Sequence, residues 1–165
     1  MNAERRTPQL FLYGSLLTGT PDRRLNKRMR RLLRRAPVAM IRARLYNLGR
    51  YPGVVFSTGT TDRVYGRVIG VGDPRLLLQL DRYEEYRIDD PAGSEFVRVL
   101  MPAQLLPSGK TIDCWVYVYN RRASGKQRIV RGDYIRFRNA WRNRHRHQGL
   151  EKRSNVPVPS EKRWG

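Results

Sequence analysis

The sequence predicts an α+β fold in which consecutive strands pair antiparallel, as a sheet or a small barrel. Residues 36–120 contain several short runs in which apolar and polar side chains alternate, as in strands that bury one face. Other segments carry apolar residues at steps of three and four, which is typical of helices with one buried side. The 165 residues are enough for one domain with a core.

The expected strands are apolar or alternating runs that end at glycine, proline or polar turn residues. The first begins at residue 10 and runs into a turn at 13–16. The others cover residues 40–48, 53–59, 63–71, 95–106 and 111–120. Cys114, the single cysteine, shares a face of the last strand with apolar residues, so we expect it to be a core residue rather than a nucleophile.

Three helices are expected between and after these strands. Residues 23–37 predict a basic helix that starts near Asp22, and residues 72–86 predict a second helix that Asp73 caps. A third is expected from residue 132 onward. We expect residues 1–8 to be an N-terminal tail, residues 9–149 a single domain, and residues 150–165 a disordered tail.

The positive charge of the chain is concentrated in two blocks. The formal net charge is +20, yet residues 36–120 hold 10 basic and 9 acidic residues, a net charge of +1. The excess lies in residues 23–35 and 136–153, which favour non-specific attraction of anions or nucleic acid. No recognised nucleic-acid-binding motif accompanies these blocks, so they are not expected to read a base sequence.

Several classes of protein are excluded. No apolar run approaches the roughly 18 residues that cross a bilayer, and no signal peptide is recognisable. One cysteine excludes an internal disulfide. We therefore expect a cytoplasmic protein, without membrane association and preferentially monomeric. No metal or other cofactor is expected, because His145 and His147 are the only histidines and lie near no carboxylate except Glu151.

Two short motifs contain residues suited to chemistry. Tyr13-Gly14-Ser15-Leu16 follows an apolar strand, and a glycine there lets successive backbone N–H groups point at one spot and hold an oxyanion. An ordinary glycine between a strand and a loop is the simpler alternative.

The second motif covers residues 80–86, in which Glu84 and Glu85 end a helix beside Tyr83 and Tyr86. A helix C-terminus prefers cations, so a carboxylate placed there can have a raised pKa and act as an acid–base group. A solvated helix end is the simpler alternative.

Seven motifs follow one another in a recognisable order. They are YGSL (13–16), ARLY with YPG (43–46 and 51–53), VYGRV (64–68), LDRYE (80–84), FVR (96–98), WVYVY (115–119) and GDY (132–134). Over roughly residues 9–135 the chain resembles the gamma-glutamylcyclotransferase-like superfamily, in particular its gamma-glutamylamine cyclotransferase-like bacterial members. The resemblance implies an α+β fold built on a small mixed or antiparallel β-barrel with flanking helices.

The resemblance also implies the site. Glu84 matches the catalytic acid–base group, and the backbone of Gly14, Ser15 and Leu16 matches the segment that binds substrate. Tyr13 and Tyr119 are expected to line the same pocket. Two positions depart from the family pattern. Glu85 replaces a glycine and is a minor rival to Glu84, and Phe96 stands where many relatives have tyrosine.

The implied reaction is cyclisation of a gamma-glutamyl amide or amine to 5-oxoproline, with release of the amine. It needs no cofactor, because the nucleophile belongs to the substrate. The alternative from another class is a non-catalytic binding module of the same fold, whose basic residues 23–35 and 136–153 hold nucleic acid or an acidic partner.

Overall fold

The computed structural model describes residues 7–56 and 61–154, with side chains as far as residue 146. It divides into two compact units, Met1–Tyr134 and Ile135–Gly165, and each is described by itself. Among the described residues, no helix has both the length and the apolar character that crossing a bilayer requires.

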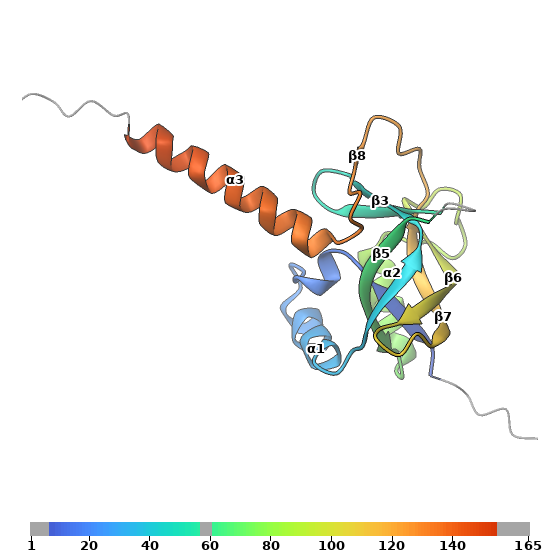
Figure 1. Ribbon diagram of the computed structural model, residues 1–165. Coiled ribbons are helices and arrows are strands. Elements are labelled where there is room, and N and C mark those ends of the chain that lie inside the picture. The colour runs from blue at the N-terminus through green and yellow to red at the C-terminus, as the bar shows by residue number, and fades with distance from the viewer. Residues whose placement is uncertain (1–6, 57–60, 155–165) are drawn as a thin grey trace, which may run out of the picture. The chain divides into compact units, whose positions relative to one another are not determined.

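Five strands of the first unit close into a barrel with the order β1-β5-β2-β6-β7 (Figure 1). They are β1 (Gln9–Leu12), β2 (Val38–Arg42), β5 (Arg63–Gly70), β6 (Phe96–Leu105) and β7 (Thr111–Tyr119). Neighbours pair antiparallel, except that β1 and β7 pair in parallel and so close the barrel. The expected small, mixed barrel in an α+β fold is therefore confirmed.

Three further strands form a separate sheet with the order β4-β3-β8. They are β3 (Arg44–Asn47), β4 (Pro52–Val55) and the short β8 (Gln127–Arg128). The prediction of one strand over residues 40–48 is wrong here, because the chain leaves strand geometry at Ala43. β2 pairs with β5 and β6 of the barrel, whereas β3 pairs with β4 and β8, and one unbroken strand cannot join both sheets.

The barrel interior is apolar and closely packed. Phe11, Ile41, Val64 and Val116 are at most 1% exposed, and Cys114 is fully buried among the core residues as expected. Burial raises the pKa of the Cys114 thiol to about 11, which keeps it protonated and unreactive near neutral pH.

Two helices pack against the barrel (Figure 1). Each begins at the aspartate that the sequence predicts as its N-cap. α1 (Arg23–Leu33) begins at Asp22, whose carboxylate accepts hydrogen bonds from the N–H groups of Arg24 and Leu25 at 2.8 and 3.0 Å. α2 (Pro74–Tyr83) begins at Asp73, which accepts from the N–H of Arg75 at 2.9 Å. Each helix buries two leucine or methionine side chains against the barrel, each burial contributing about 1.5–3 kcal/mol.

The third helix, α3 (Tyr134–Ser154), makes up most of the described part of the second unit. Within it, the ring of Trp141 stacks on that of His145 with 4.0 Å between centroids. The helix continues to Ser154, past residue 149, where the predicted domain ends and the predicted tail of residues 150–165 follows. Residues 155–165 of that predicted tail, and residues 1–6 of the N-terminal one, lie outside the described residues.

Candidate active site

The two motifs that the sequence singles out meet at one pocket of about 220 Å³. Tyr13, Gly14, Ser15 and Leu16 line it from the end of β1, and residues 83–85 line it from the end of α2. The other lining residues are Phe11, Leu12, Pro21, Tyr51, Pro52, Glu95, Phe96 and Tyr117. Among the described residues, the pocket is thus lined by three glutamates and by no lysine or arginine.

The backbone turns sharply at the end of β1. Residues Ser15–Leu17 form a single 3₁₀ turn, closed by a hydrogen bond of 3.0 Å from the N–H of Leu17 to the carbonyl of Gly14. Among the loop hydrogen bonds of the described residues, none begins at the N–H of Ser15 or Leu16. A Cβ on Gly14 would lie 2.9 Å from Cγ of Pro52, so only glycine fits beside that wall of the pocket.

Tyr13 holds this turn in place. Its hydroxyl donates a hydrogen bond of 2.7 Å to the carbonyl of Tyr117 and accepts one of 3.2 Å from the N–H of Val54. Burial raises the pKa of the Tyr13 phenol well above its ordinary value. Because both contacts are to backbone, the phenol joins β1 to β7 and β4 and is not directed at a ligand.

The end of α2 is a Schellman turn, which places Glu84 at the C-cap. The N–H of Tyr86 bonds to the carbonyl of Asp81 at 2.8 Å, and that of Glu85 to the carbonyl of Arg82 at 3.3 Å. Glu85 has a φ of 55°, the left-handed conformation that glycine adopts without strain. Glu85, in place of the glycine that relatives usually have, therefore keeps this turn but strains the backbone.

A side-chain contact joins the two motifs. The hydroxyl of Tyr83, directly before Glu84, bonds to Oγ of Ser15 at 3.1 Å. This contact fixes the end of α2 against the turn after β1, and Glu84, Ser15 and Leu16 line the same pocket.

Glu84 has the electrostatics of an acid–base group. Its side chain is partly buried, and no hydrogen-bond or ion-pair partner of its carboxylate is found among the described residues. Burial, and secondly the negative charge of Glu95, raise the pKa of Glu84 to about 8. The sequence suggested a raised pKa from the helix end and the neighbouring tyrosines, so the direction agrees but the causes differ.

Sequence reasoning missed Glu95, which directly precedes β6. The hydroxyl of Tyr51 lies 2.9 Å from each carboxylate oxygen of Glu95, and burial together with this carboxylate raises the pKa of Tyr51 to about 12. Tyr51 belongs to the YPG motif, but nothing in the local sequence marks its acidic partner.

The structure places Tyr119 outside the pocket lining. Its ring packs against that of Phe96, with 5.6 Å between centroids, and Phe96 also contacts the ring of Tyr51 at 5.8 Å. Phe96 itself lines the pocket, so Tyr119 supports the wall from behind.

A buried ion pair anchors α2 to the barrel behind the pocket. Asp81 accepts a hydrogen bond of 2.7 Å from the hydroxyl of Tyr117 and lies 3.4 Å from Nη1 of Arg98. The Arg98 guanidinium sits over the rings of Trp115 and Tyr86, at 5.1 and 5.6 Å. Three of the sequence motifs therefore meet here, although their positions in the chain do not indicate it.

No metal centre is found in the described part of the chain, where no three His, Cys, Asp or Glu side chains are grouped to hold an ion. His147, one of the two histidines considered from the sequence, has its side chain outside the described residues.

Comparison with known proteins agrees with the family resemblance of the sequence motifs. Residues 10–136 match the family described as "Gamma-glutamyl cyclotransferase, AIG2-like". The chain is 31% identical over 127 residues to the gamma-glutamylcyclotransferase family protein ytfP of Citrobacter rodentium, covering 77% of this chain and 95% of that one. It is 30% identical over 154 residues to the gamma-L-glutamyl-butirosin B gamma-glutamyl cyclotransferase of Niallia circulans, covering 91% and 86%.

Solved structures of other proteins have a similar fold. The crystal structure of protein PH0828 from Pyrococcus horikoshii matches with a TM-score of 0.54 at 18% identity, over 84% of this chain and 98% of that one. An AIG2-like protein from mouse matches with a TM-score of 0.51 at 21% identity, over 70% and 79%. At these identities the likeness concerns the fold. The match over residues 10–136, together with the two relatives of 30% identity or more, shows that the chain belongs to the AIG2-like gamma-glutamyl cyclotransferase family.

Proposed function

We propose that the protein cyclises a gamma-glutamyl amide or amine to 5-oxoproline and releases the amine. The observation that carries the proposal is the position of Glu84, a carboxyl group whose pKa is raised to about 8, in a pocket that Ser15 and Leu16 also line. Among the described residues, the N–H groups of Ser15 and Leu16 donate no loop hydrogen bond. A pKa near the working pH suits a group that takes and returns a proton in one turnover.

The reaction needs a proton shuttle rather than a protein nucleophile. Ionised Glu84 accepts a proton from the substrate α-ammonium, and the freed amine attacks the gamma-carbonyl carbon. Protonated Glu84 then donates to the leaving nitrogen as the carbon–nitrogen bond breaks. The attacking nitrogen loses a second proton to solvent as the lactam forms, and the released amine takes up a second proton from solvent. The protons therefore balance, and no other reagent is consumed.

The turn after β1 supplies the anchor. The N–H groups of Ser15 and Leu16 bind the substrate carboxylate or the oxygen that becomes negative during attack. Holding the α-amine near the gamma-carbonyl lowers the barrier by roughly 7 kcal/mol or more in favourable intramolecular reactions. The hydrogen bond from the Tyr83 hydroxyl to Oγ of Ser15 holds this turn and Glu84 in fixed positions relative to each other.

A panel of gamma-glutamyl compounds tests the proposal by release of 5-oxoproline. It contains a gamma-glutamylamine, a gamma-glutamyl peptide and a gamma-glutamyl aminoglycoside, since one relative is named for gamma-L-glutamyl-butirosin B. Glu84→Gln is expected to lower the rate about 100-fold or more, the usual size of a general-base effect.

Glu85→Gln, one residue away, is the comparison variant and is expected to keep most of the rate. If it loses activity while Glu84→Gln keeps it, the acid–base group is Glu85. The absence of 5-oxoproline from every compound in the panel would reject the proposed function.

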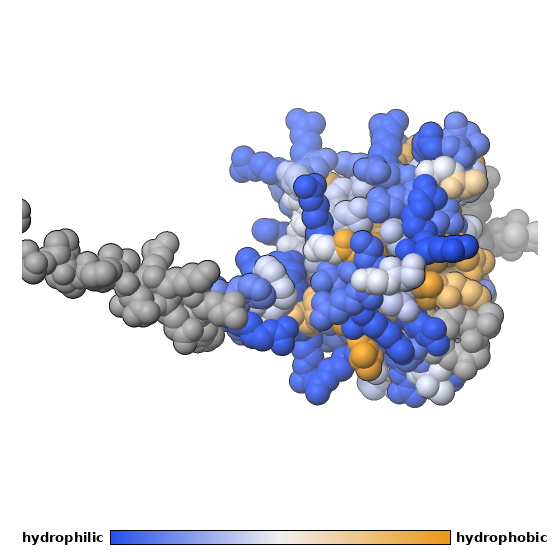
Figure 2. All heavy atoms as spheres, turned by 90° about the horizontal axis from the view of Figure 1, so that it is seen from above, coloured by the Kyte–Doolittle hydropathy of each residue, from blue (hydrophilic) through white to orange (hydrophobic). Residues whose placement is uncertain are grey.

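A second candidate function is binding of nucleic acid by α1. Leu25 and Met29 bury the apolar side of this helix, so that side is not available to enter a membrane. Its outer side presents a hollow lined by Arg23, Asn26, Lys27, Arg30, Arg31 and Arg34. Figure 2 shows that hydrophilic side chains also cover much of the face seen from above, so the polar surface is not confined to α1.

The salt dependence of binding tests this second function. About five phosphate contacts give a slope near −4.5 in a plot of log affinity against log salt concentration, a loss of a few hundred-fold from 50 to 200 mM salt. Replacing both Arg30 and Arg31 with glutamine is expected to reduce the slope by about 2. Duplex binding that this double variant leaves unchanged would exclude α1 as the contact.

A further inference from the structure

A second hollow, of about 660 Å³, lies beside the candidate active site. It is lined by Arg82, Glu85, Tyr86, Arg87, Gly93, Glu95 and Arg121, and we name it the arginine hollow. Glu85 and Glu95 line both this hollow and the pocket that holds Glu84, so they stand at the boundary between the two. A substrate bound in the pocket beside Glu84 would therefore lie next to this boundary.

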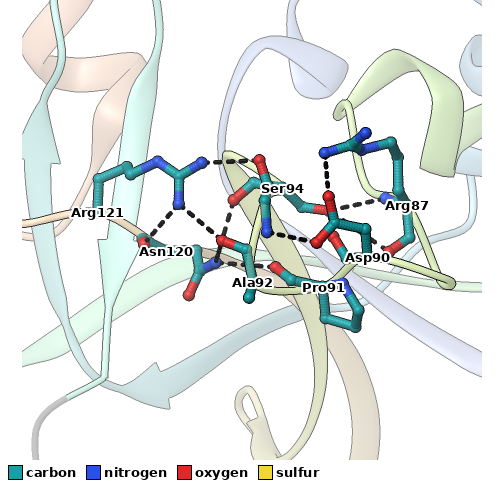
Figure 3. A network of polar contacts seen from close by, with 8 residues as sticks. Arg87, Asp90, Pro91, Ala92, Ser94, Asn120 and Arg121 are labelled. Atoms are coloured by element: carbon teal, nitrogen blue, oxygen red, sulfur yellow. Dashed lines mark hydrogen bonds and ion pairs between the residues drawn. The ribbon is translucent and has the colours of Figure 1, made fainter.

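The loop that forms one wall of the arginine hollow is firmly built, as Figure 3 shows. The buried Ser94 hydroxyl donates to the carbonyl of Asp90 at 2.9 Å and accepts from the N–H of Arg87 at 2.9 Å. The side-chain amide of Asn120 donates to the carbonyls of Pro91 and Ser94, each at 3.0 Å. These contacts fix Glu95, the next residue, at the boundary.

The same loop positions two of the three arginines. Arg121 donates to the carbonyls of Ala92 and Gly93 at 3.0 and 2.7 Å, and Arg87 forms an ion pair with Asp90 (Figure 3). A Cβ on Gly93 would meet the Asp90 carboxylate and the Arg87 guanidinium, so a larger residue there would displace this ion pair. Because the loop already holds the side chains of Arg87 and Arg121 in place, they lose little conformational entropy when they bind an anion.

Arg82 completes the set from the last turn of α2. It is exposed, and among the described residues it has no ion-pair or hydrogen-bond partner for its guanidinium. The side chains lining the hollow carry three positive and two negative charges, and Asp90 already pairs with Arg87. Among the described residues, Arg82 and Arg121 are therefore the lining cations without an ion-pair partner. A guanidinium binds a carboxylate through paired N–H donors, so the ligand that best fits this lining carries a carboxylate.

We propose, on the basis of the proposed function, that the arginine hollow binds a carboxylate of the leaving amine. The preferred substrates are then gamma-glutamyl derivatives of amino acids or peptides, in which the leaving nitrogen and a carboxylate belong to the same group. Gamma-glutamyl derivatives of diamines place a cation among three guanidiniums and are disfavoured.

Three substrates of similar size test this inference, by kcat and KM for 5-oxoproline release. They are gamma-glutamylglycine, the gamma-glutamyl derivative of glycinamide, and mono-gamma-glutamyl-ethylenediamine, whose leaving groups carry a negative, a neutral and a positive end. KM is expected to be lowest for gamma-glutamylglycine, about tenfold higher for the amide, and higher again for the diamine, because a charge-assisted contact is worth about one order of magnitude in binding.

Arg82→Gln isolates the hollow, since this side chain supports no loop contact. It is expected to raise KM for gamma-glutamylglycine about tenfold while leaving KM for the glycinamide derivative unchanged. Arg42→Gln, at an exposed arginine of β2 that lines neither hollow, is the matched control and is expected to change neither.

The outcomes separate this inference from the proposed function. Turnover with equal kcat/KM for all three substrates, or with preference for the diamine, overturns the carboxylate subsite and leaves the cyclotransferase activity standing. An equal effect of Arg82→Gln on charged and neutral substrates also overturns it. Release of no 5-oxoproline from any of the three, nor from the wider panel, rejects the activity and this inference with it.

Discussion

Replacing Glu84 with glutamine is expected to stabilise the protein at alkaline pH while it lowers turnover about 100-fold or more. The carboxyl group has a pKa of about 8 in the fold and an ordinary value of 4.5. The folded state therefore holds this proton more tightly than the unfolded chain. Stability that is fully present below pH 4.5 is lost as the pH rises through 8, because ionisation of Glu84 is unfavourable inside the pocket.

The size of this stability change follows from the difference between the two pKa values. Each pH unit over which only the folded state keeps the proton changes the free energy of unfolding by about 1.4 kcal/mol. Complete ionisation would destabilise the fold on the order of 5 kcal/mol, and partial exposure of the side chain reduces this to about 2–4 kcal/mol. Glu84→Gln has no proton to lose, so this penalty is absent from it.

The assay is urea denaturation followed by tryptophan fluorescence at pH 5, 7 and 9. The difference in unfolding free energy between Glu84→Gln and the natural protein is expected to increase by about 2–4 kcal/mol from pH 5 to pH 9, with an unchanged m value. Asp113→Asn, which removes an exposed carboxylate outside the pocket, is the control for the loss of one negative charge. A constant difference for Glu84→Gln would refute the raised pKa and the role that rests on it.

Three further changes test the contacts that support the site. Glu85→Gly, at φ 55°, is expected to raise the free energy of unfolding by about 0.5–1 kcal/mol in denaturant titrations, because relief of the left-handed strain exceeds the added entropy of the unfolded chain. Tyr13→Phe removes one hydrogen bond from each of two buried backbone groups and is expected to lower the free energy of unfolding by about 2 kcal/mol. Arg98→Met leaves Asp81 buried and unpaired, so we expect a loss of about 3–5 kcal/mol and a much smaller loss when Asp81→Asn is added, measured as a double-mutant cycle.

Features that depend on neighbouring residues could be predicted from the sequence. The starts of α1 and α2 follow from Asp22 and Asp73, because a capping carboxylate bonds N–H groups two or three positions ahead in the chain. The strands of the barrel follow from side-chain alternation within each run. Glu84 and the turn at Gly14 came from a resemblance in motif order, and each alone was compatible with an ordinary helix end or loop.

Features that depend on contacts between distant segments could not be predicted. The break at Ala43 arises because β2 and β3 pair with different sheets, and no residue there is a turn former. Glu95 enters the pocket because Ser94 and Asn120 fix a loop whose partners are 26 residues apart in the chain. Its influence on Glu84 is a property of the folded molecule alone.

The charge of the candidate pocket is opposite in sign to the net charge of the chain. A protein with a net charge of +20 lines its candidate pocket with three glutamates and, among the described residues, with no basic side chain. A pocket inside a positive field would normally favour ionised carboxylates, so the raised pKa of Glu84 requires burial and the close charge of Glu95 to exceed that field.

The same separation of charge orients a substrate. A gamma-glutamyl group brings an α-ammonium, which is attracted to Glu84 and Glu95 in the pocket, beside an α-carboxylate, for which the backbone of Ser15 and Leu16 is the proposed anchor. The arginine hollow beyond the boundary attracts negative charge and disfavours a cation. A molecule that carries its ammonium at one end and a carboxylate at the other therefore has one favourable orientation across the two sites. That orientation places its amide carbonyl between them, beside Glu84, where the proposed cyclisation occurs.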